Sequence, residues 1–258
     1  MQAHYPRNKA KTFLDIVRRI ENWPTAVGMR LRRRATGDRL LAFRDGLTVI
    51  CRGSLDWPAI HELLFAGCYD AGIHHLPGGQ CKTVLDLGGN IGLFSLRAAQ
   101  HLPEATVHAF EPGPPNYRLF EMNLLANPSL AARVHLHREA VGGEASTANW
   151  CIDANSPGGA NLYDTSGKSF SVSVRSFESV VASIGGQIDF LKMDIEGAEY
   201  DLLRGTPPAV WEQVTSIALE LHHDYTGRMT PEQFLQQMQE MGYSPHARWA
   251  DTHFLHRR

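Results

Sequence analysis

The sequence predicts an α/β fold of the Rossmann-like type, in which helices cover both faces of a mainly parallel sheet. Strand-like and helix-like segments alternate from residue 83 onward at the spacing of right-handed βαβ units. A glycine-rich turn, Gly88-x-Asn90-x-Gly92, follows the first of these strands, and an acidic residue, Glu111, follows the second. This strand–loop–helix arrangement is typical of proteins that bind a nucleotide at the carboxyl end of a parallel strand.

The elements of this domain are expected in a regular order. The strands are predicted at 83–87, 106–110, 134–137, 188–193 and 216–221, and the helices at 91–101, 114–126, 177–184 and about 231–241. The last helix has clear boundaries, because Thr230 is a suitable N-cap, Pro231 a suitable first residue and Gly242 a suitable terminator. A final strand of an antiparallel pair is expected around His253. The buried face of helix 114–126 is predicted to consist of Leu119, Phe120, Met122 and Leu125.

Residues 146–175 interrupt this alternation. Phe170, Val172 and Val174 alternate with polar residues, which is the period of a strand. This segment is expected to pair with residues 148–152 across a turn at 156–159. The sequence therefore predicts a β-hairpin inserted between the third strand and the helix that follows it.

The N-terminal part is basic and is expected to form a separate extension. Residues 1–45 contain eleven Lys and Arg residues against four Asp and Glu residues and read as helical, with an interruption at Pro24. The main domain is assigned to residues 46–258, beginning with a strand at 47–50, a helix at about 57–68 and a linker at 76–79. The basic charge fits a solvated face beside an amphipathic helix. Attraction of an acidic substrate, an acidic carrier protein or a membrane surface is the alternative.

The composition is that of an ordinary soluble globular protein, with 43% hydrophobic and 20% charged residues. No apolar run is long enough for a transmembrane helix, and the N-terminus lacks the pattern of a secretory signal. Nucleic acid is not an expected partner, because no aromatic residues are interleaved with the N-terminal arginines to stack on bases. The cysteines Cys51, Cys68, Cys81 and Cys151 lack metal-ligand spacing, so their thiols are expected to be reduced. A cytoplasmic location is therefore expected for the protein.

The first loop differs from that of dinucleotide-binding proteins, because a carboxylate, Asp86, opens it. Next to a pyrophosphate this carboxylate would be repelled, by about 4 kcal/mol at about 4 Å. It suits a ligand with an ammonium and a sulfonium group, and S-adenosylmethionine is such a ligand. A nicotinamide or flavin site, or a turn that serves packing alone, is the alternative. The residues expected to bind the cofactor are Asp86, Gly88, Asn90 and Gly92 in the loop, Glu111 at the ribose hydroxyls, Glu139 and Ala140 at the adenine, and Asp194.

Four segments occur in the order and spacing of the FkbM-type S-adenosylmethionine-dependent methyltransferases, a family that the chain resembles over roughly residues 45–245. They are residues 84–92, 110–112, 189–199 and 219–222, and the most diagnostic is the run from Lys192 to Glu199. The resemblance implies a seven-stranded (class I) methyltransferase sheet and methyl transfer, usually to oxygen. It also implies a small molecule, a sugar or another natural product as the acceptor, without fixing which one.

Titratable residues follow the fourth and fifth predicted strands, where ligands bind in open α/β sheets. His222 is expected to be the general base, because an unperturbed imidazole accepts a proton at neutral pH. Asp194 and Glu196 are expected to orient the acceptor. The Asp/Asn/Ser-Pro-Pro-aromatic run of many amino-directed methyltransferases is absent after the fourth strand. The acceptor atom is therefore expected to be an oxygen, in a hydroxyl or carboxyl group.

Several alternatives stay open. The chain could be a non-catalytic module that binds S-adenosylmethionine, although such a module has no need of the acidic residues, or it could methylate a nitrogen or a nucleic acid. The acceptor could be acidic or attached to a carrier. The carboxylates and His222 could bind Mg²⁺ or another divalent ion, but these ligands come from two loops without compact spacing, so no metal is expected. Glu196 and Glu199 could merely neutralise a helix N-terminus, and Lys192 is expected to pair with a carboxylate.

Overall fold

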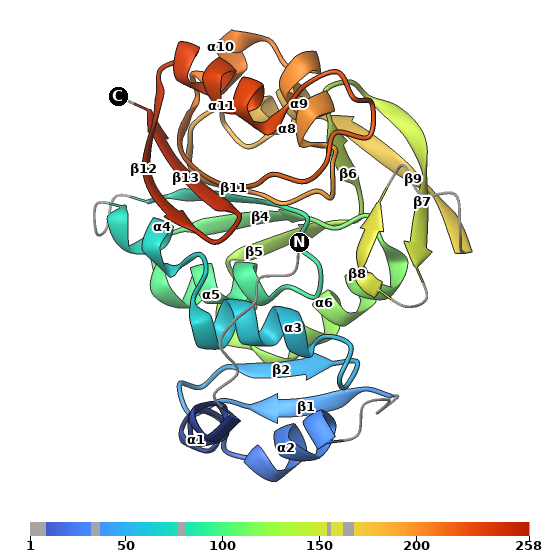
Figure 1. The fold of residues 1–258 in the computed structure, drawn as a ribbon, viewed down its shortest axis with the longest axis vertical. Helices are drawn as coiled ribbons and strands as arrows, with labels where there is room; N and C mark the ends of the chain where they lie inside the picture. The colour runs from blue at the N-terminus through green and yellow to red at the C-terminus, as the bar shows by residue number, and fades with distance from the viewer. Residues whose placement is uncertain (1–8, 32–36, 77–80, 154–155, 162–167, 258) are drawn as a thin grey trace.

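The computed structural model describes residues 9–31, 37–76, 81–153, 156–161 and 168–257. Its centre is a seven-stranded sheet in the order β12-β13-β11-β10-β3-β4-β5 (Figure 1). Its strands are β3 (Thr83–Leu87), β4 (Thr106–Phe110), β5 (Val134–His137), β10 (Ile188–Met193), β11 (Val214–Glu220), β12 (Tyr243–Trp249) and β13 (Thr252–Arg257). Neighbours from β5 to β11 pair in parallel, whereas β13 is antiparallel to both β11 and β12. The predicted fold class is confirmed.

Helices cover both faces of this sheet, as predicted (Figure 1). One face carries α5 (Leu93–His101) and α6 (Pro114–Ala126), and the other carries α8 (Phe177–Ser183), α9 (Glu199–Gly205), α10 (Pro208–Trp211) and α11 (Pro231–Glu240). Short helices α4 (Asp70–His75) and α7 (Pro128–Ala131) complete this part. Because successive strand residues point to opposite faces, Val84 and Phe190 belong to one apolar core and Leu85 and Leu191 to the other. This explains the continuous apolar runs in the sequence.

The boundaries of α11 agree with the predicted signals. The Thr230 hydroxyl accepts a hydrogen bond from the Gln233 backbone N–H at 3.3 Å, and the Gln233 side chain accepts one from the Thr230 N–H at 2.8 Å. This reciprocal pair is a capping box, and it satisfies backbone donors that a helix start leaves unpaired. The helix ends before Gly242, which has a φ of 93°.

The buried face predicted for α6 is only partly right. Leu119 and Phe120 are buried, but Leu125 is 81% exposed. Asn123 takes a place in the interior instead, because its side chain accepts a hydrogen bond from the Ile50 N–H at 2.6 Å and donates one to the Ile91 carbonyl at 2.7 Å. A buried polar side chain is favourable there since its hydrogen bonds are made.

In the N-terminal part, the described residues up to Leu31 are mainly helical, and a strand lies beyond them. It contains α1 (Lys9–Arg19) and α2 (Trp23–Leu31), but the segment expected to be helical also includes β1 (Arg39–Ala42), which pairs with β2 (Thr48–Cys51). Ile16 and Ile20 pack in one core with Leu93 and Leu96 of α5. The helix expected at 57–68 is α3 (Trp57–Ile60) followed by a π-helical turn, η1 (His61–Ala66). The domain boundary near residue 45 stays a prediction.

Parts of two sequence-based expectations lie outside the described residues, namely most of the 76–79 linker and Arg32, Arg33 and Arg34 of the basic segment. In the part of the chain that the structure describes, no helix is long and apolar enough to cross a membrane.

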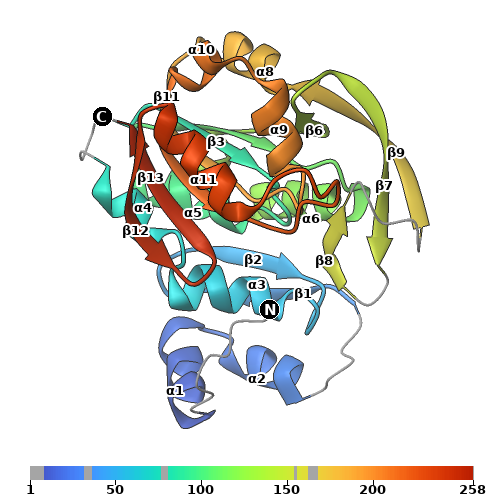
Figure 2. The same ribbon diagram turned by 45° about the horizontal axis from the view of Figure 1, so that its top comes forward.

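The predicted hairpin is part of a larger sheet. β7 (Ser146–Asp153) pairs antiparallel with β9 (Lys168–Ser176), with Trp150 opposite Phe170, as expected. The residues expected to form its turn instead form β8 (Ser156–Asn161), and β6 (Ala140–Gly142) adds a parallel strand, so the order is β6-β9-β7-β8. The extra strands give hydrogen-bond partners to edges that a lone hairpin would leave open. Figure 2 shows this sheet beside the central one.

Candidate active site

The glycine loop and the loop after β4 are tied together by Glu111. The N–H groups of Gly88 and Gly89 donate to the Phe110 carbonyl at 3.1 and 2.9 Å. The Glu111 carboxylate accepts from the Asn90 N–H at 2.8 Å and from the Gly113 N–H at 2.7 Å. Burial raises the pKa of Glu111 to about 7, even though these N–H groups stabilise its charged form. Glu111 therefore holds the loop while one side of its carboxylate faces a cavity.

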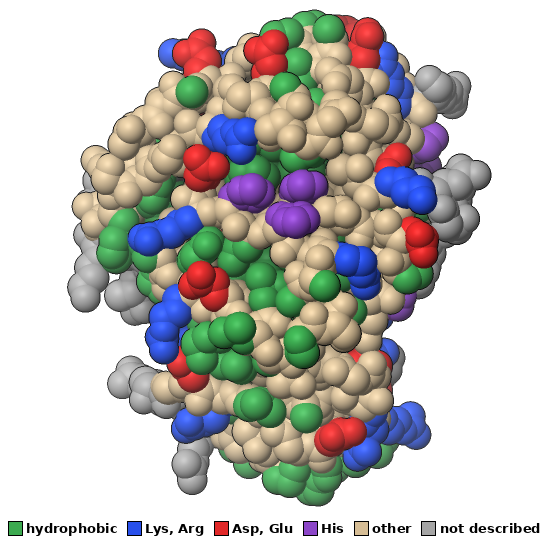
Figure 3. All heavy atoms as spheres, turned by 180° about the vertical axis from the view of Figure 1, so that it is seen from behind, with side chains coloured by type: hydrophobic (Ala, Val, Ile, Leu, Met, Phe, Trp, Pro, Cys, Tyr) green, Lys and Arg blue, Asp and Glu red, His purple; other side chains and the backbone are tan. Residues whose placement is uncertain are grey.

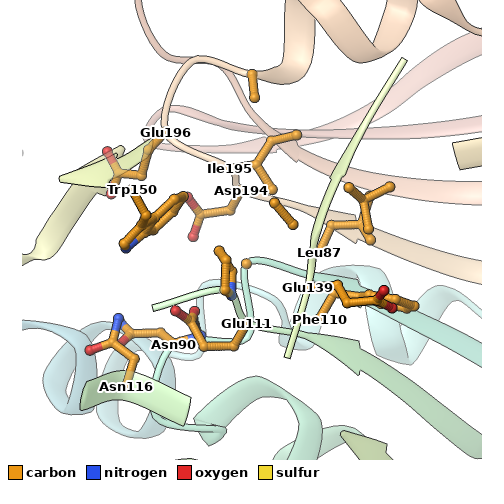
Figure 4. Close-up of a pocket in the computed structure, with 15 residues that line it drawn as sticks. Leu87, Asn90, Phe110, Glu111, Asn116, Glu139, Trp150, Asp194, Ile195 and Glu196 are labelled. Atoms are coloured by element: carbon orange, nitrogen blue, oxygen red, sulfur yellow. Dashed lines mark hydrogen bonds between the residues drawn. The ribbon is translucent and has the colours of Figure 1, made fainter. Parts of the chain in front are cut away.

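This cavity opens at the carboxyl ends of β3, β4 and β10, where a ligand of an open α/β sheet is expected. It is lined by Leu87, Gly88, Asn90, Phe110, Glu111, Pro112, Asn116, Glu139, Ala140, Val141, Trp150, Asp194, Ile195, Glu196 and Ala198. Figure 4 shows Asp194 and Glu196 on one side and Asn90, Glu111 and Asn116 on the other. Most of the residues predicted for cofactor and acceptor are thus brought together.

Two polar atoms of the cavity walls have no hydrogen-bond partner among the described residues. They are Asn90 Oδ1 and Trp150 Nε1, and both are buried. A buried polar group without a partner costs about 1–3 kcal/mol, so a polar ligand in this cavity would remove that cost. The residues present therefore fit a ligand with hydroxyl and heterocyclic nitrogen groups, such as the adenosine of S-adenosylmethionine.

Asp86 and Gly92 do not line the cavity, contrary to the prediction of direct cofactor contacts. Asp86 is fully buried and accepts a hydrogen bond from the Ser95 hydroxyl at 2.6 Å. Its strand register places it beside Lys192 of β10. Burial raises the pKa of Asp86, and the charge of Lys192 opposes that rise. A Cβ at Gly92 would clash with the Phe120 ring, and the backbone there has a φ of 88°. Glycine is therefore needed at this position for close packing and for its left-handed conformation.

Lys192 pairs with carboxylates, as predicted. Its ammonium lies 3.5 Å from Asp86 Oδ1 and 3.3 Å from Asp194 Oδ2. It also donates to the carbonyl oxygens of Gly88 at 2.6 Å and Leu87 at 3.3 Å. Burial alone would lower the pKa of Lys192, but the charges of Asp194 and Asp86 raise it well above its usual value. Lys192 thus connects the glycine loop to the loop after β10, and Asp86 contacts this lysine rather than the cavity.

A second group of residues surrounds His222, directly after β11. His222 Nδ1 lies 3.0 Å from Glu199 Oε1, while Nε2 lies 3.7 Å from Glu196 Oε2 and 3.9 Å from both Asp194 Oδ1 and Glu220 Oε1. We call these five residues the acidic cluster. Their side chains come together because β10 and β11 are adjacent parallel strands.

The acidic cluster shifts the pKa values of its own members. Burial alone would lower the pKa of His222, but the hydrogen bond and charge of Glu199, with the charges of Asp194 and Glu196, raise it to about 10. With its pKa raised in this way, the imidazole would hold its proton at neutral pH unless the acceptor or another ligand changes its surroundings, and the role of His222 as general base stays a prediction. Burial raises the pKa of Glu196 to about 7 and, with the charge of Asp194, that of Glu220 to about 8.

Sequence reasoning missed several residues of the site. Trp150 and Asn116 line the cavity from β7 and from the first turn of α6. Trp150 lies in the inserted sheet, and no sequence spacing connects it to the glycine loop. Glu62, in the π-helical turn η1, does not line the cavity, but burial and the charges of Asp194 and Asp251 raise its pKa.

The sheet order, the glycine loop with its paired glutamate and the site at the strand ends define a Rossmann-like methyltransferase fold. Residues 86–245, more than half of the chain, match the model of the methyltransferase FkbM domain. The chain therefore belongs to the FkbM methyltransferase family and is a methyltransferase. This confirms the resemblance found in the sequence.

Individual relatives are similar at a moderate level. Methyltransferase sdnD of Sordaria araneosa is 28% identical over 209 residues, covering 68% of this chain and 79% of that protein. The 31-O-demethyl-FK506 methyltransferase FkbM of Streptomyces tacrolimicus is 29% identical, covering 62% of this chain and 72% of that protein. A crystal structure of methyltransferase FkbM from Methylobacillus flagellatus KT is 20% identical with a TM-score of 0.46, covering 71% of this chain and 45% of that chain.

Proposed function

We propose that this methyltransferase transfers a methyl group from S-adenosylmethionine to an oxygen atom of a small molecule, such as a natural product or a sugar. The observation that carries the proposal is that a single cavity joins Gly88, Asn90 and Glu111 to the acidic residues Asp194 and Glu196. The first set suits adenosine, and the second suits a sulfonium and an acceptor hydroxyl.

The cofactor residues have distinct roles in this proposal. Glu111 accepts hydrogen bonds from the ribose hydroxyls, and Glu139 with the Ala140 backbone contacts the adenine. Gly88 allows the close approach of the ligand to the loop. Asp194 supplies a negative charge near the ammonium and sulfonium groups, which Asp86 supports indirectly through Lys192.

The reaction is an in-line displacement in which the acceptor oxygen forms a bond to the methyl carbon. The carbon–sulfur bond breaks, its electron pair stays on sulfur, and S-adenosylhomocysteine leaves. The proton of a hydroxyl acceptor passes to a carboxylate of the acidic cluster. Catalysis then depends mainly on alignment of the two reactants, which is worth several kcal/mol when the geometry is held.

Two further observations favour a small oxygen acceptor. The relative from Streptomyces tacrolimicus carries an oxygen acceptor in its name, 31-O-demethyl-FK506. The acidic cluster would repel the phosphates of a nucleic acid, which makes nucleic-acid methylation the weaker candidate. We place the reaction in the cytoplasm, a proposal supported by the free thiols of Cys51, Cys68 and Cys81.

Calorimetry with S-adenosylmethionine tests the cofactor part. We expect Glu111→Gln to bind about 10–100-fold more weakly than the unmodified protein, because the ribose hydroxyls lose a charged acceptor worth about 1.5–3 kcal/mol. Glu104→Gln is the matched control, because Glu104 is exposed and remote from the cavity. No binding by the unmodified protein, or unchanged affinity in Glu111→Gln, would contradict the assignment.

A screen with isotope-labelled S-adenosylmethionine tests the acceptor part. We expect label to appear as a methyl ether or ester on hydroxylated or carboxylated small molecules. Label on amines, on RNA or on DNA alone would overturn the oxygen assignment while leaving the cofactor assignment intact.

A further inference from the structure

We propose that Asp194, Glu196 and His222 form a binding site for one divalent cation, Mn²⁺ or Mg²⁺, beside the methyl acceptor. The role of the ion in catalysis rests on the proposed function, whereas binding of the ion does not. Each of the three side chains offers one ligand atom, and these atoms lie within 4.8 Å of one another.

The distances in the cluster are those of atoms around a common ion. His222 Nε2 is 3.7 Å from Glu196 Oε2 and 3.9 Å from Asp194 Oδ1. These separations exceed the roughly 2.7–3.2 Å of a hydrogen bond. Two ligand atoms that each lie about 2.1–2.2 Å from a metal are about 3–4.4 Å apart, depending on the angle between them. The two separations from His222 Nε2 are therefore too long for hydrogen bonds and fall in the range of two ligands that share an ion.

Within the cluster, the orientation of His222 is fixed by Glu199. Its Nδ1 lies 3.0 Å from Glu199 Oε1, and Glu199 is fully buried and held by the N–H groups of Ile195 at 3.0 Å and Gly197 at 2.9 Å. A carboxylate only accepts, so Nδ1 carries a hydrogen, and Nε2 faces Asp194 and Glu196, where a bound ion would replace its proton. In many metal sites, the ring nitrogen of a histidine that does not bind the metal donates its hydrogen to a carboxylate in this way.

The backbone of Glu196 is also held in an unusual conformation. Its φ is 55°, and only Asn90 and Ala250 share a positive φ among the described non-glycine residues. This conformation costs about 1 kcal/mol or more for a residue with a side chain. The Glu196 carboxylate lies 3.7 Å from His222 Nε2.

The charge of the site calls for a cation. Asp194, Glu196, Glu199 and Glu220 all approach His222 within 4 Å. The nearby ammonium of Lys192 contacts Asp194 through Oδ2, at 3.3 Å, which leaves Oδ1 on the side of His222. A divalent ion at this position would neutralise carboxylates that otherwise repel one another in a partly buried place.

The donor set indicates the kind of ion. Two carboxylates and one imidazole suit Mn²⁺ and Mg²⁺, whereas a thiolate that would select a softer metal is absent from this cluster. In octahedral coordination three positions remain for water and for oxygen atoms of the acceptor. A bound ion would make an acceptor hydroxyl more acidic, so that its proton would pass more readily to a neighbouring carboxylate.

The test measures binding of Mn²⁺ to the full, metal-stripped chain, by calorimetry and by the loss of the free-ion EPR signal, without S-adenosylmethionine. We expect one site per chain, and affinity reduced about 10–100-fold or more in His222→Ala and in Glu196→Gln. His223→Ala is the matched control, because His223 is adjacent and exposed. Circular dichroism shows that each variant is folded. No binding at about 1 mM Mn²⁺, or unchanged affinity in both folded variants, would overturn the proposal.

A chelator separates this proposal from the proposed function. Methyl transfer that stops with EDTA and returns with Mn²⁺ or Mg²⁺ supports both. Methyl transfer that is unaffected by EDTA overturns the role of the ion and leaves the proposed function standing. Specific Mn²⁺ binding at His222 without transfer to any acceptor supports the ion site and counts against the proposed function.

Discussion

Gly88 lies at the closest approach between the glycine loop and the loop after β10. Its φ is 82°, and a Cβ at this position would clash with the backbone carbonyl oxygen of Asp194. We expect Gly88→Ala to lower the free energy of unfolding by about 2–4 kcal/mol, because conformational strain and overlap with backbone add together. Urea denaturation measures this loss, and calorimetry should show weaker binding of S-adenosylmethionine as the two loops move apart.

Gly185→Ala is the control for Gly88→Ala. Gly185 has a φ of 94°, but a Cβ there would meet no atom within 4 Å. Only the conformational cost of about 1 kcal/mol remains, so cofactor affinity should not change. Equal losses of stability in the two variants would show that the contact with Asp194 is not important.

At the scale of elements, α11 is stabilised by its capping box. We expect Thr230→Ala to lower the free energy of unfolding by about 1 kcal/mol, because the Gln233 N–H loses its acceptor. In a chain of this size the melting temperature should fall by about 2–4 °C. Gln239→Ala, on the exposed face of the same helix, should leave it nearly unchanged. If the melting temperature of Thr230→Ala equals that of the unmodified protein, the capping box does not contribute to stability.

At the scale of the whole molecule, histidines on the edge of the sheet make stability depend on pH. The rings of His108 and His135 stack at 5.1 Å, and those of His108 and His137 at 6.3 Å. Figure 3 shows histidine side chains gathered on the face opposite that of Figure 1. Burial and the charges of His135 and His137 lower the pKa of His108 to about 4. Folding therefore favours the neutral form of this residue.

The sign of the effect follows from this lowered pKa. Between about pH 6.5 and 4 the unfolded chain binds a proton that folded His108 does not, so stability is present above pH 6.5 and is lost as the pH falls. The full pKa shift corresponds to a contribution of about 3 kcal/mol to the free energy of unfolding, and partial exposure of the ring reduces this contribution to about 1–2 kcal/mol. Urea denaturation at several pH values should show a smaller acid loss for His108→Phe. Exposed His223→Phe is the control, and identical pH profiles for all three proteins would refute the assignment.

Features that depend on local chemistry were predictable from the residues alone. The bounds of β3, β4, β5, β10 and α6 agree with the prediction, because apolar runs, prolines and glycines act within a few residues of chain. The glycine loop and Glu111 were recognisable for the same reason, since a turn that approaches a ligand needs particular residue types at fixed spacing. The seven-stranded sheet was implied by the resemblance to the family, whereas the order of its strands comes from the structure.

Features that depend on distant neighbours could not be read from the chain. β1 and β8 form because edges of other strands need partners, and Leu125 is exposed because Asn123 fills the interior position with its hydrogen bonds. Asp86 does not line the cavity, and its carboxylate contacts Lys192 on the neighbouring strand instead.

The acidic cluster shows this difference most clearly. Asp194 and Glu196 are far from His222 in sequence, and their spacing indicated no metal. Adjacent parallel strands bring them to the same sheet edge, and the buried carboxylate of Glu199 fixes which nitrogen of His222 faces them. Residue types are properties of the chain, but pKa values and the distances between ligand atoms arise from neighbours that only folding brings within a few ångströms.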